Sequence, residues 1–218
     1  AQQQLEATSG IDAIQDAHGV YYLYFLAERE DDIKGRRQFE ALGEIETDFE
    51  NVRTAWIRAV DQENYDDLNT VIECLDWFCA FRGHWQEGRE LFRYSREGLT
   101  LARVEDPHLV WGRIVIRDEA FHGFPPLETV WKQIEQCLAW AEQHDDQLEV
   151  AYCLNSFGNA MFEVGTDYDI SLHYWSEALT LYTELNDTHY VAWLHLRIGK
   201  CYGAMKQGAK FTEYMHRS

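Results

Sequence analysis

Apolar side chains in the first third of the chain recur at the spacing of an amphipathic helix. Between residues 36 and 62 they follow steps of three or four, at Phe39, Leu42, Ile45, Phe49, Val52, Trp56 and Val60. Such steps place side chains on one face of an α-helix. The same spacing covers residues 12–32, and Gly35 separates the two runs. The pattern predicts a helical hairpin over residues 1–62, with Tyr22, Phe49, Val52 and Trp56 buried between it and the helices that follow.

Short breaks divide the rest of the chain into shorter helical segments. They fall at Gly83, Pro107, Pro125-Pro126, Asp145-Asp146, Gly165, Asn186-Asp187 and Gly208. Gly83 and Gly165 are 82 residues apart, and half of that step places further breaks beside Gly123 and Gly208. Helix pairs that recur about every 40 residues are typical of an all-α solenoid. The spacing predicts about four helix pairs over residues 63–218, the last incomplete, with Gly83, Gly123 and Gly165 in turns between antiparallel helices.

Residues 151–178 resemble a tetratricopeptide repeat. The likeness is carried by the run from Ala151 to Met161, in which Gly158 is the small residue of the first helix, and then by Gly165, Tyr168, Ser171, Trp175 and Ala178. Residues 192–202 follow the same pattern, whereas the units around Gly83 and Gly123 fit it only at the turn and the second helix. The resemblance implies a right-handed α-α superhelix, a tetratricopeptide-like solenoid.

Residues 18–56 resemble the start of the superhelical sensor region in bacterial signal-transduction NTPases with numerous domains, the STAND proteins. The residues that carry this likeness are His18 to Arg29, Gly35, and the run from Ile45 to Trp56. In that family the hairpin follows nucleotide-binding and winged-helix modules, so the resemblance implies an attached NTPase module in the parent protein. The chain itself has no GxxxxGK[ST] phosphate-binding loop. We expect the NTPase to precede Ala1, which is not a Met, and further repeats to follow Ser218.

The charge balance narrows the choice of partners. The chain has 38 Asp and Glu against 19 Lys and Arg, a net charge of −19. So acidic a chain repels nucleic-acid backbones and anionic membranes, and no apolar run is long enough to span a bilayer. Without a signal sequence, the expected location is the cytoplasm. The five cysteines lie in apolar stretches without CxxC spacing, which predicts buried thiols rather than a disulfide framework or a metal site.

Catalytic motifs are missing from the sequence. It contains no HExxH and no Gly-x-Ser-x-Gly, and its acidic doublets fall at predicted helix ends, where N-caps explain them. The sequence therefore predicts a protein that is not an enzyme and that uses no cofactor or metal. An all-helical hydrolase, the remaining catalytic alternative, would depend on Glu73, Asp118 and Glu119.

A binding surface is the sharper candidate. The first helices of the pairs carry polar residues three or four apart, and so on one helical face: Arg113, Arg117, Asn155, Asn159, Arg197 and Lys200. In register, these would form a basic, amide-bearing strip for an acidic peptide, a C-terminal carboxylate or a phosphorylated metabolite. Intrahelical ion pairs on a solvated face are the alternative. Of the eight Trp, Trp111 and Trp193 could line the same groove, as could Trp77, whereas Trp56, Trp85 and Trp175 are expected in the core.

Together these features predict a non-enzymatic sensor or protein-interaction module of a bacterial STAND-type signalling or transcriptional regulator. Its partner would be a protein, a peptide or a small anionic ligand bound in a concave groove. The alternative is a free-standing tetratricopeptide scaffold or peptide receptor.

Overall fold

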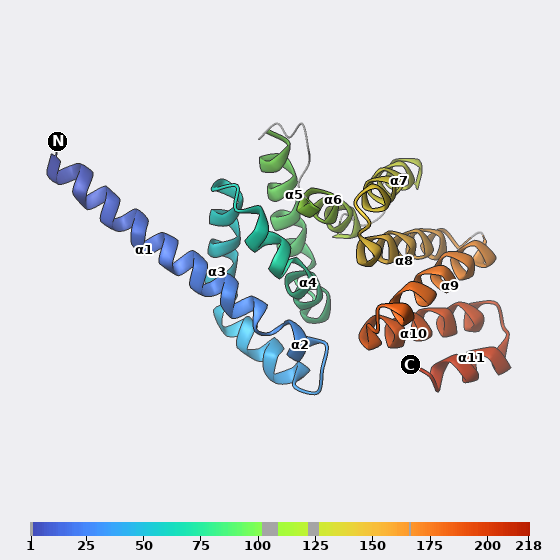
Figure 1. The fold of residues 1–218 in the computed structure, drawn as a ribbon. Helices are drawn as coiled ribbons and strands as arrows, with labels where there is room; N and C mark the ends of the chain where they lie inside the picture. The colour runs from blue at the N-terminus through green and yellow to red at the C-terminus, as the bar shows by residue number, and fades with distance from the viewer. Residues whose placement is uncertain (1, 102–108, 122–126, 166) are drawn as a thin grey trace. The chain divides into compact units, whose positions relative to one another are not determined.

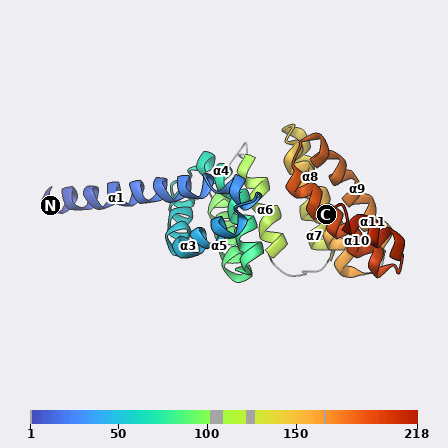
Figure 2. The same ribbon diagram turned by 90° about the horizontal axis from the view of Figure 1, so that it is seen from below.

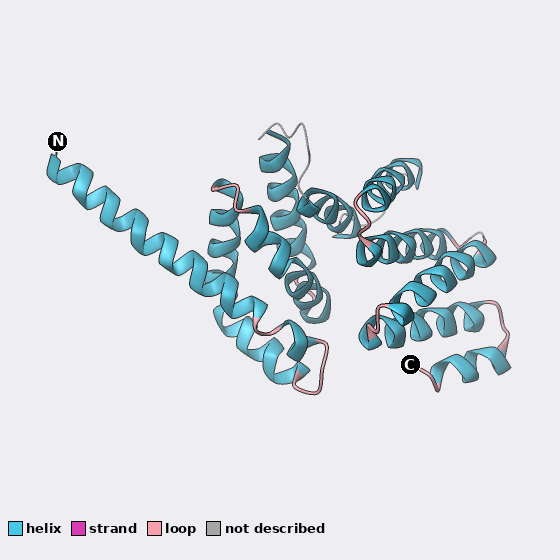
Figure 3. Cartoon of the chain, in the orientation of Figure 1, coloured by secondary structure: helices cyan, strands magenta, loops and turns pink. Residues whose placement is uncertain are grey.

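Every regular element in the described part of the chain is an α-helix, in agreement with the predicted all-α class (Figures 1 and 3). The computed structural model describes residues 2–101, 109–121, 127–165 and 167–218. The contacts divide the chain into two compact units, Ala1–Phe121 and His122–Ser218. This division differs from the predicted boundary at residue 62, because the N-terminal hairpin shares its core with the helices that follow it.

The N-terminal unit contains α1 (Gln2–Ala27), α2 (Glu30–Ile33), α3 (Gln38–Asp61), α4 (Tyr65–Arg82), α5 (Trp85–Leu101) and α6 (Leu109–Phe121). The hairpin of α1 and α3 packs against α4, and α3 also packs against α5. α6 packs against α4 and α5. Trp56 links the hairpin to α5, because its Nε1 donates a hydrogen bond to Ser95 Oγ at 2.8 Å and its ring meets Phe92 edge to face.

The predicted burial of Phe49, Val52 and Trp56 is confirmed, and Tyr22 is half-buried with its hydroxyl donating to Asp48. Phe39 is the exception in the apolar run, with 87% of its surface exposed. Seventeen residues separate it from Trp56, and at about 100° per residue this carries Phe39 about 100° around the helix from Trp56. Two successive steps of three, from Phe39 to Leu42 and from Leu42 to Ile45, fall short of full helical turns and carry Phe39 away from the buried face.

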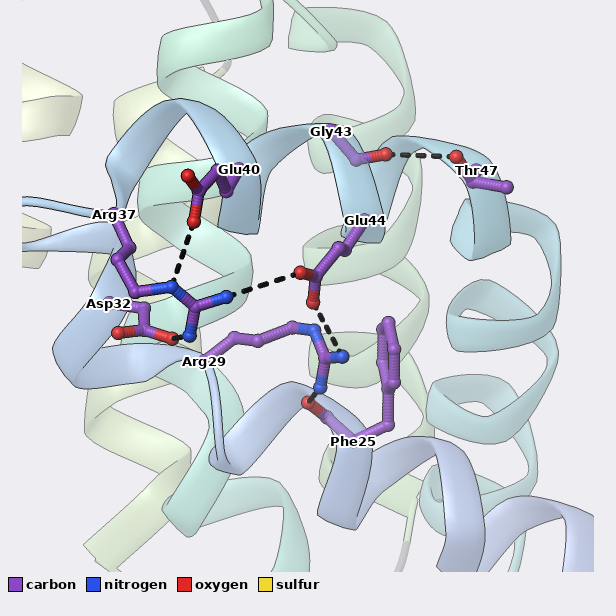
Figure 4. A network of polar contacts seen from close by, with 8 residues as sticks. All are labelled: Phe25, Arg29, Asp32, Arg37, Glu40, Gly43, Glu44 and Thr47. Carbon is purple, nitrogen blue, oxygen red and sulfur yellow. Dashed lines mark hydrogen bonds and ion pairs between the residues drawn. The ribbon is translucent and has the colours of Figure 1, made fainter.

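An ionic network holds the corner between α1 and α3 (Figure 4). Arg29 donates a hydrogen bond to the Phe25 carbonyl at 2.7 Å and pairs with Glu44 at 2.7 Å. Arg37 pairs with Asp32 at 2.7 Å, with Glu40 at 2.8 Å and with Glu44 at 3.5 Å. Glu44 therefore joins two arginines from opposite ends of the α1–α3 connection.

The C-terminal unit contains α7 (Leu127–Gln143), α8 (Gln147–Val164), α9 (Tyr168–Glu184), α10 (Thr188–Ala204) and α11 (Gly208–Met215), each packed on the next. Acidic N-caps begin three of these helices, as expected for the doublet Asp145-Asp146. The carboxylates of Asp146, Asp167 and Asp187 accept hydrogen bonds from backbone N–H groups in the first turns of α8, α9 and α10. Such caps satisfy donors that have no partner inside the helix.

The period deduced from the glycines recurs in the backbone. Left-handed residues occur at Glu63, Asp145 and Asn186, and again at Gly83, Gly165 and Lys206, so that both series have steps of 82 and 41 residues. Gly83 and Gly165 lie in turns between helices, as predicted, and adopt φ values of 77° and 68°, which glycine reaches without the steric cost of a Cβ. Gly123, Pro107 and the Pro125-Pro126 break lie outside the described residues.

Gly158 of α8 is required by the close approach of Trp175 from α9, whose side chain is fully buried. A Cβ at Gly158 would lie 2.5 Å from Nε1 of the indole and closer still to its Cδ1. Gly158→Ala should therefore lower the free energy of unfolding of the C-terminal unit by about 1 to 3 kcal/mol, as overpacking does. Urea unfolding measures this, with Gly208→Ala as control, because a Cβ there meets no atom within 4 Å. Equal stability of the two variants would contradict the prediction.

All five cysteines are buried thiols, as predicted, at positions 74, 79, 137, 153 and 201. Among the tryptophans, Trp56 and Trp175 are fully buried as expected. The expectation for Trp85 is wrong, since 51% of its surface is exposed. Trp85 is the first residue of α5, next to the Gly83 turn, whereas Trp175 lies two turns into α9, where neighbouring helices cover it on all sides.

Candidate functional site

The predicted binding residues lie on three helices in two units. Trp111, Arg113 and Arg117 belong to α6 of the N-terminal unit. Asn155 and Asn159 belong to α8, and Trp193, Arg197 and Lys200 to α10, in the C-terminal unit. The part of the predicted strip on α6 is therefore described within the N-terminal unit, and the part on α8 and α10 within the C-terminal unit.

Arg117 lies inside the N-terminal unit rather than on an exposed strip. Only 1% of its surface is accessible. Its Nη2 donates to Glu73 Oε1 at 2.8 Å, and its Nε lies 3.5 Å from Asp76 Oδ2. The face of α6 that carries Arg117 packs on α4, where both carboxylates are buried. Arg117 was expected to contact a ligand, but its contacts give it a structural role in the N-terminal unit. Arg113, one helical turn away, is half-buried.

Two charges hold Glu73 in its ionised form. Burial alone would raise the pKa of this carboxyl, but Arg117 and Lys34, whose Nζ lies 3.1 Å from Glu73 Oε2, outweigh burial and lower the pKa. Asp118 is equally buried, and its Oδ2 pairs with Arg96 Nη1 at 3.0 Å. Both carboxylates proposed for a hydrolase therefore serve as ion-pair partners, and the side chain of Glu119 lies outside the described residues.

Arg197 and Asn159 come together in the C-terminal unit, as the predicted strip requires. Arg197 Nη2 donates a hydrogen bond to Asn159 Oδ1 at 2.8 Å, which joins α10 to α8. The guanidinium carbon lies 5.3 Å from the Trp175 ring centre, 5.5 Å from Phe162 and 6.0 Å from Trp193. Distances of this order permit cation–π attraction. Arg197 is thus enclosed by three aromatic rings and one amide.

The charge on Arg197 has no carboxylate partner within ion-pair distance among the described residues, and its buried Nε donates no hydrogen bond to them. Burial lowers the pKa of the guanidinium, and Glu163 opposes this shift from a distance. An arginine nevertheless stays charged in a protein, and a buried charge is costly unless it is paired. The arrangement therefore favours an anion beside Arg197, for which a carboxylate or phosphate has the matching two-oxygen geometry.

The remaining residues of the predicted strip differ in their position relative to Arg197. Lys200 is exposed, three residues along α10 and so on the same helical face, where it adds a second positive charge. Asn155 is 5% exposed, and its Oδ1 accepts no hydrogen bond from the described residues. Trp193 contacts the guanidinium, whereas Trp111 belongs to the other unit.

Phe162 is a site residue that the sequence reasoning missed. It follows Asn159 by three residues, so the same face-sharing rule that selected Asn155 and Asn159 also selects Phe162. Trp175 was expected only in the core. Both rings contact Arg197 as well, so they belong to the core and to the candidate site at once.

The fold and the site together define an all-helical protein with a half-buried arginine presented by packed helices. Across the described residues, no group of three His, Cys, Asp or Glu side chains could hold a metal ion. None of the helices in that part of the chain is both long and apolar enough to cross a membrane. Comparisons with protein-family models, curated proteins and solved structures give no match to this sequence.

Proposed function

We propose that this chain is a non-enzymatic binding module that captures an anionic group of a protein, peptide or small ligand at Arg197. The observation that carries the proposal is a charged guanidinium, enclosed by three aromatic rings, whose one hydrogen bond to the described residues goes to a neutral amide. A carboxylate or phosphate would complete its hydrogen bonds and neutralise its charge. Asn159 would orient the guanidinium, and Lys200 would add attraction at longer range.

The wider function that we propose is that of the sensor region of a bacterial STAND-type regulator, built as a right-handed tetratricopeptide-like superhelix. Its support is the N-terminal hairpin together with left-handed turns that recur at steps of 82 and 41 residues. Ligand occupancy would then bias an attached NTPase between two states. A free-standing tetratricopeptide scaffold in the cytoplasm is the alternative. The genomic sequence upstream of Ala1 separates the two, because a phosphate-binding loop there supports the sensor and a nearby start codon supports the scaffold.

The anion site is tested by calorimetric titration with a short peptide of Asp and Glu residues that has a free C-terminal carboxylate. Arg197→Gln should weaken its binding by about 10- to 100-fold, because one charge-assisted interaction contributes about 1.5 to 3 kcal/mol. Binding to the unaltered chain should also weaken as salt is added. Inorganic phosphate and the amidated peptide, titrated in parallel, show which kind of anion the site prefers.

Arg217→Gln is the matched control for this titration. Arg217 lies in the same unit, is 53% exposed and is paired with Glu213 at 2.7 Å, so its loss should leave peptide affinity unchanged. Equal affinities of the Arg197→Gln variant and the unaltered chain would exclude Arg197 as the site. The same conclusion would follow if none of the three probes binds.

A further inference from the structure

Helix α1 has an apolar face that no other described helix covers. Its N-terminal half extends beyond the rest of the N-terminal unit (Figures 1 and 2). Ile14, Val20, Tyr21 and Tyr24 are 60% to 71% exposed. The opposite face is the one that packs, because Leu23 and Leu26 are buried and Asp16 pairs with Arg58 of α3 at 2.7 Å. Packing on that side fixes the rotation of α1, and the apolar face is held outward.

The exposed face follows the spacing by which helices pair with helices. Its central residues, Gly10, Ile14, Ala17, Tyr21 and Tyr24, are separated by steps of four and three. Such a repeat of 3.5 residues forms the seam of a two-helix contact. The positions directly beside this seam carry no Asp, Glu, Lys or Arg; they are Ile11, Ala13, His18, Val20, Phe25 and Ala27. Charge pairs therefore do not determine which helix binds to this face. The fit of its side chains by size determines it instead.

Side-chain sizes along the seam match those of a second copy in the antiparallel direction. In the register that places Gly10 opposite Tyr21 of the second copy, Ile14 faces Ala17 of that copy. Val20 then faces Ala13 at the edge of the seam. Each layer thus pairs a large side chain with a small one, which is the condition for close packing. In a parallel pair, Gly10 and Ala17 would face themselves across voids while Tyr21 would meet Tyr21, so that direction packs poorly.

We propose that two copies of this chain pair through α1 as an antiparallel dimer, a property separate from the anion site and from the function proposed above. The seam from Gly10 to Tyr24 is about 21 Å long at 1.5 Å per residue. A seam this short buries a small surface area, at the low end for protein interfaces. The dimer therefore forms in a concentration-dependent way. Each copy carries a net charge of −19, and the two repel each other. Salt screens this repulsion and stabilises the dimer, which is opposite to its effect at Arg197.

Analytical ultracentrifugation of the full chain, over a hundredfold range of concentration at low and high salt, tests the proposal. The dimer fraction should rise with concentration, and the dissociation constant should fall several-fold at high salt. Tyr21→Glu should leave the chain monomeric, because a carboxylate would be buried in the seam. Phe39→Glu is the control, since it makes the same kind of change at a side chain that is 87% exposed on α3 and should leave dimerisation unchanged.

A second variant distinguishes the size-matched seam from general apolar contact. Ala17→Trp adds apolar surface, which would strengthen an unspecific association. In the antiparallel seam it meets Ile14 of the second copy, and dimerisation should weaken at least tenfold. Neither Ala17 nor Tyr21 belongs to the buried core. Circular dichroism should accordingly show unchanged helix content in both variants.

The direction of pairing is measured with a spin label at Glu28→Cys, just beyond the end of α1. All five native cysteines are buried, so the label attaches to the new thiol. In the antiparallel register two labels lie about 35 to 40 Å apart along the seam, and in a parallel pair about 10 Å apart. A chain that stays monomeric throughout, a dimer that survives Tyr21→Glu, or a short label distance would each overturn the proposal.

Discussion

Replacing Trp56 by alanine is expected to lower the free energy of unfolding of the N-terminal unit by about 3 to 5 kcal/mol, the usual cost of truncating a large core side chain. The indole is fully buried between α3 and α5. Its loss also leaves the buried Ser95 hydroxyl without the donor that reaches it at 2.8 Å. Cavity formation and the broken hydrogen bond therefore act in the same direction.

Urea unfolding followed by circular dichroism measures the Trp56 effect, and Trp85→Ala is its control. Trp85 also lies in the N-terminal unit, but half of its surface is exposed, so its truncation should change the stability by about 0.5 kcal/mol or less. Because the chain has two compact units, the Trp56 effect should appear in one unfolding transition and leave the other in place. A Trp56→Ala variant as stable as Trp85→Ala would show that the hairpin is not anchored on α5.

The second large effect is expected for Arg117→Met. Removing one partner of a buried ion pair costs about 3 to 5 kcal/mol, because the remaining charge stays buried without compensation. Here the remaining charges are Glu73 and Asp76, which Arg117 contacts at 2.8 Å and 3.5 Å. The measured quantity is again the free energy of unfolding of the N-terminal unit at neutral pH.

In the Arg117→Met variant, the contribution of Glu73 to the free energy of unfolding should change with pH in the opposite direction from that in the unaltered chain. With Arg117 present, the pKa of Glu73 is lowered, so its stabilising charge is present above the ordinary carboxyl pKa and is lost as the pH falls through the folded-state value. Without Arg117, the attraction that opposes the effect of burial is weaker, and the pKa of Glu73 rises. Acid then neutralises an unfavourable buried charge, and the stability difference from the unaltered chain should shrink between pH 7 and about pH 4.

A double variant, Arg117→Met with Glu73→Leu, tests the cause. Replacing both partners by apolar side chains of similar volume should recover much of the lost stability, because the buried Glu73 carboxylate that lost its contact with Arg117 is then gone. Arg37→Met is the control, since Arg37 takes part in an exposed ionic network and is 55% exposed. A double variant no more stable than Arg117→Met alone would show that packing, not charge, accounts for the loss.

The helices and their turns could be predicted because their causes are local in sequence. Gly83 and Gly165 mark turns that need a left-handed residue, and the apolar steps from Leu42 to Val60 give α3 its buried face. Phe39 and Trp85 were misjudged for a different reason. Burial depends on which residues a neighbouring helix covers: Phe39 lies about 100° around α3 from Trp56, and Trp85 is the first residue of α5.

The candidate site could be predicted only in part, because its contacts are distant in sequence. Arg117 meets Glu73 across 44 residues and Arg197 meets Asn159 across 38. The periodic pattern gave both arginines the same status. What separates them is the helix that each faces, since α4 presents buried carboxylates to Arg117 whereas α8 presents an amide and an aromatic ring to Arg197. A sequence period indicates that two helices are neighbours, but not whether the residues between them neutralise a charge.

The buried thiols make each unit report on its own local unfolding. Burial raises the pKa of the Cys74 thiol in the N-terminal unit and raises that of Cys201 in the C-terminal unit to about 11. Only an exposed thiolate reacts readily with a thiol reagent, so labelling of either residue requires the helices around it to separate first. The labelling rates at Cys74 and Cys201 therefore measure the opening of the two units separately, in one sample and without any substitution. A ligand bound at Arg197, four residues from Cys201, should slow the second rate and leave the first unchanged.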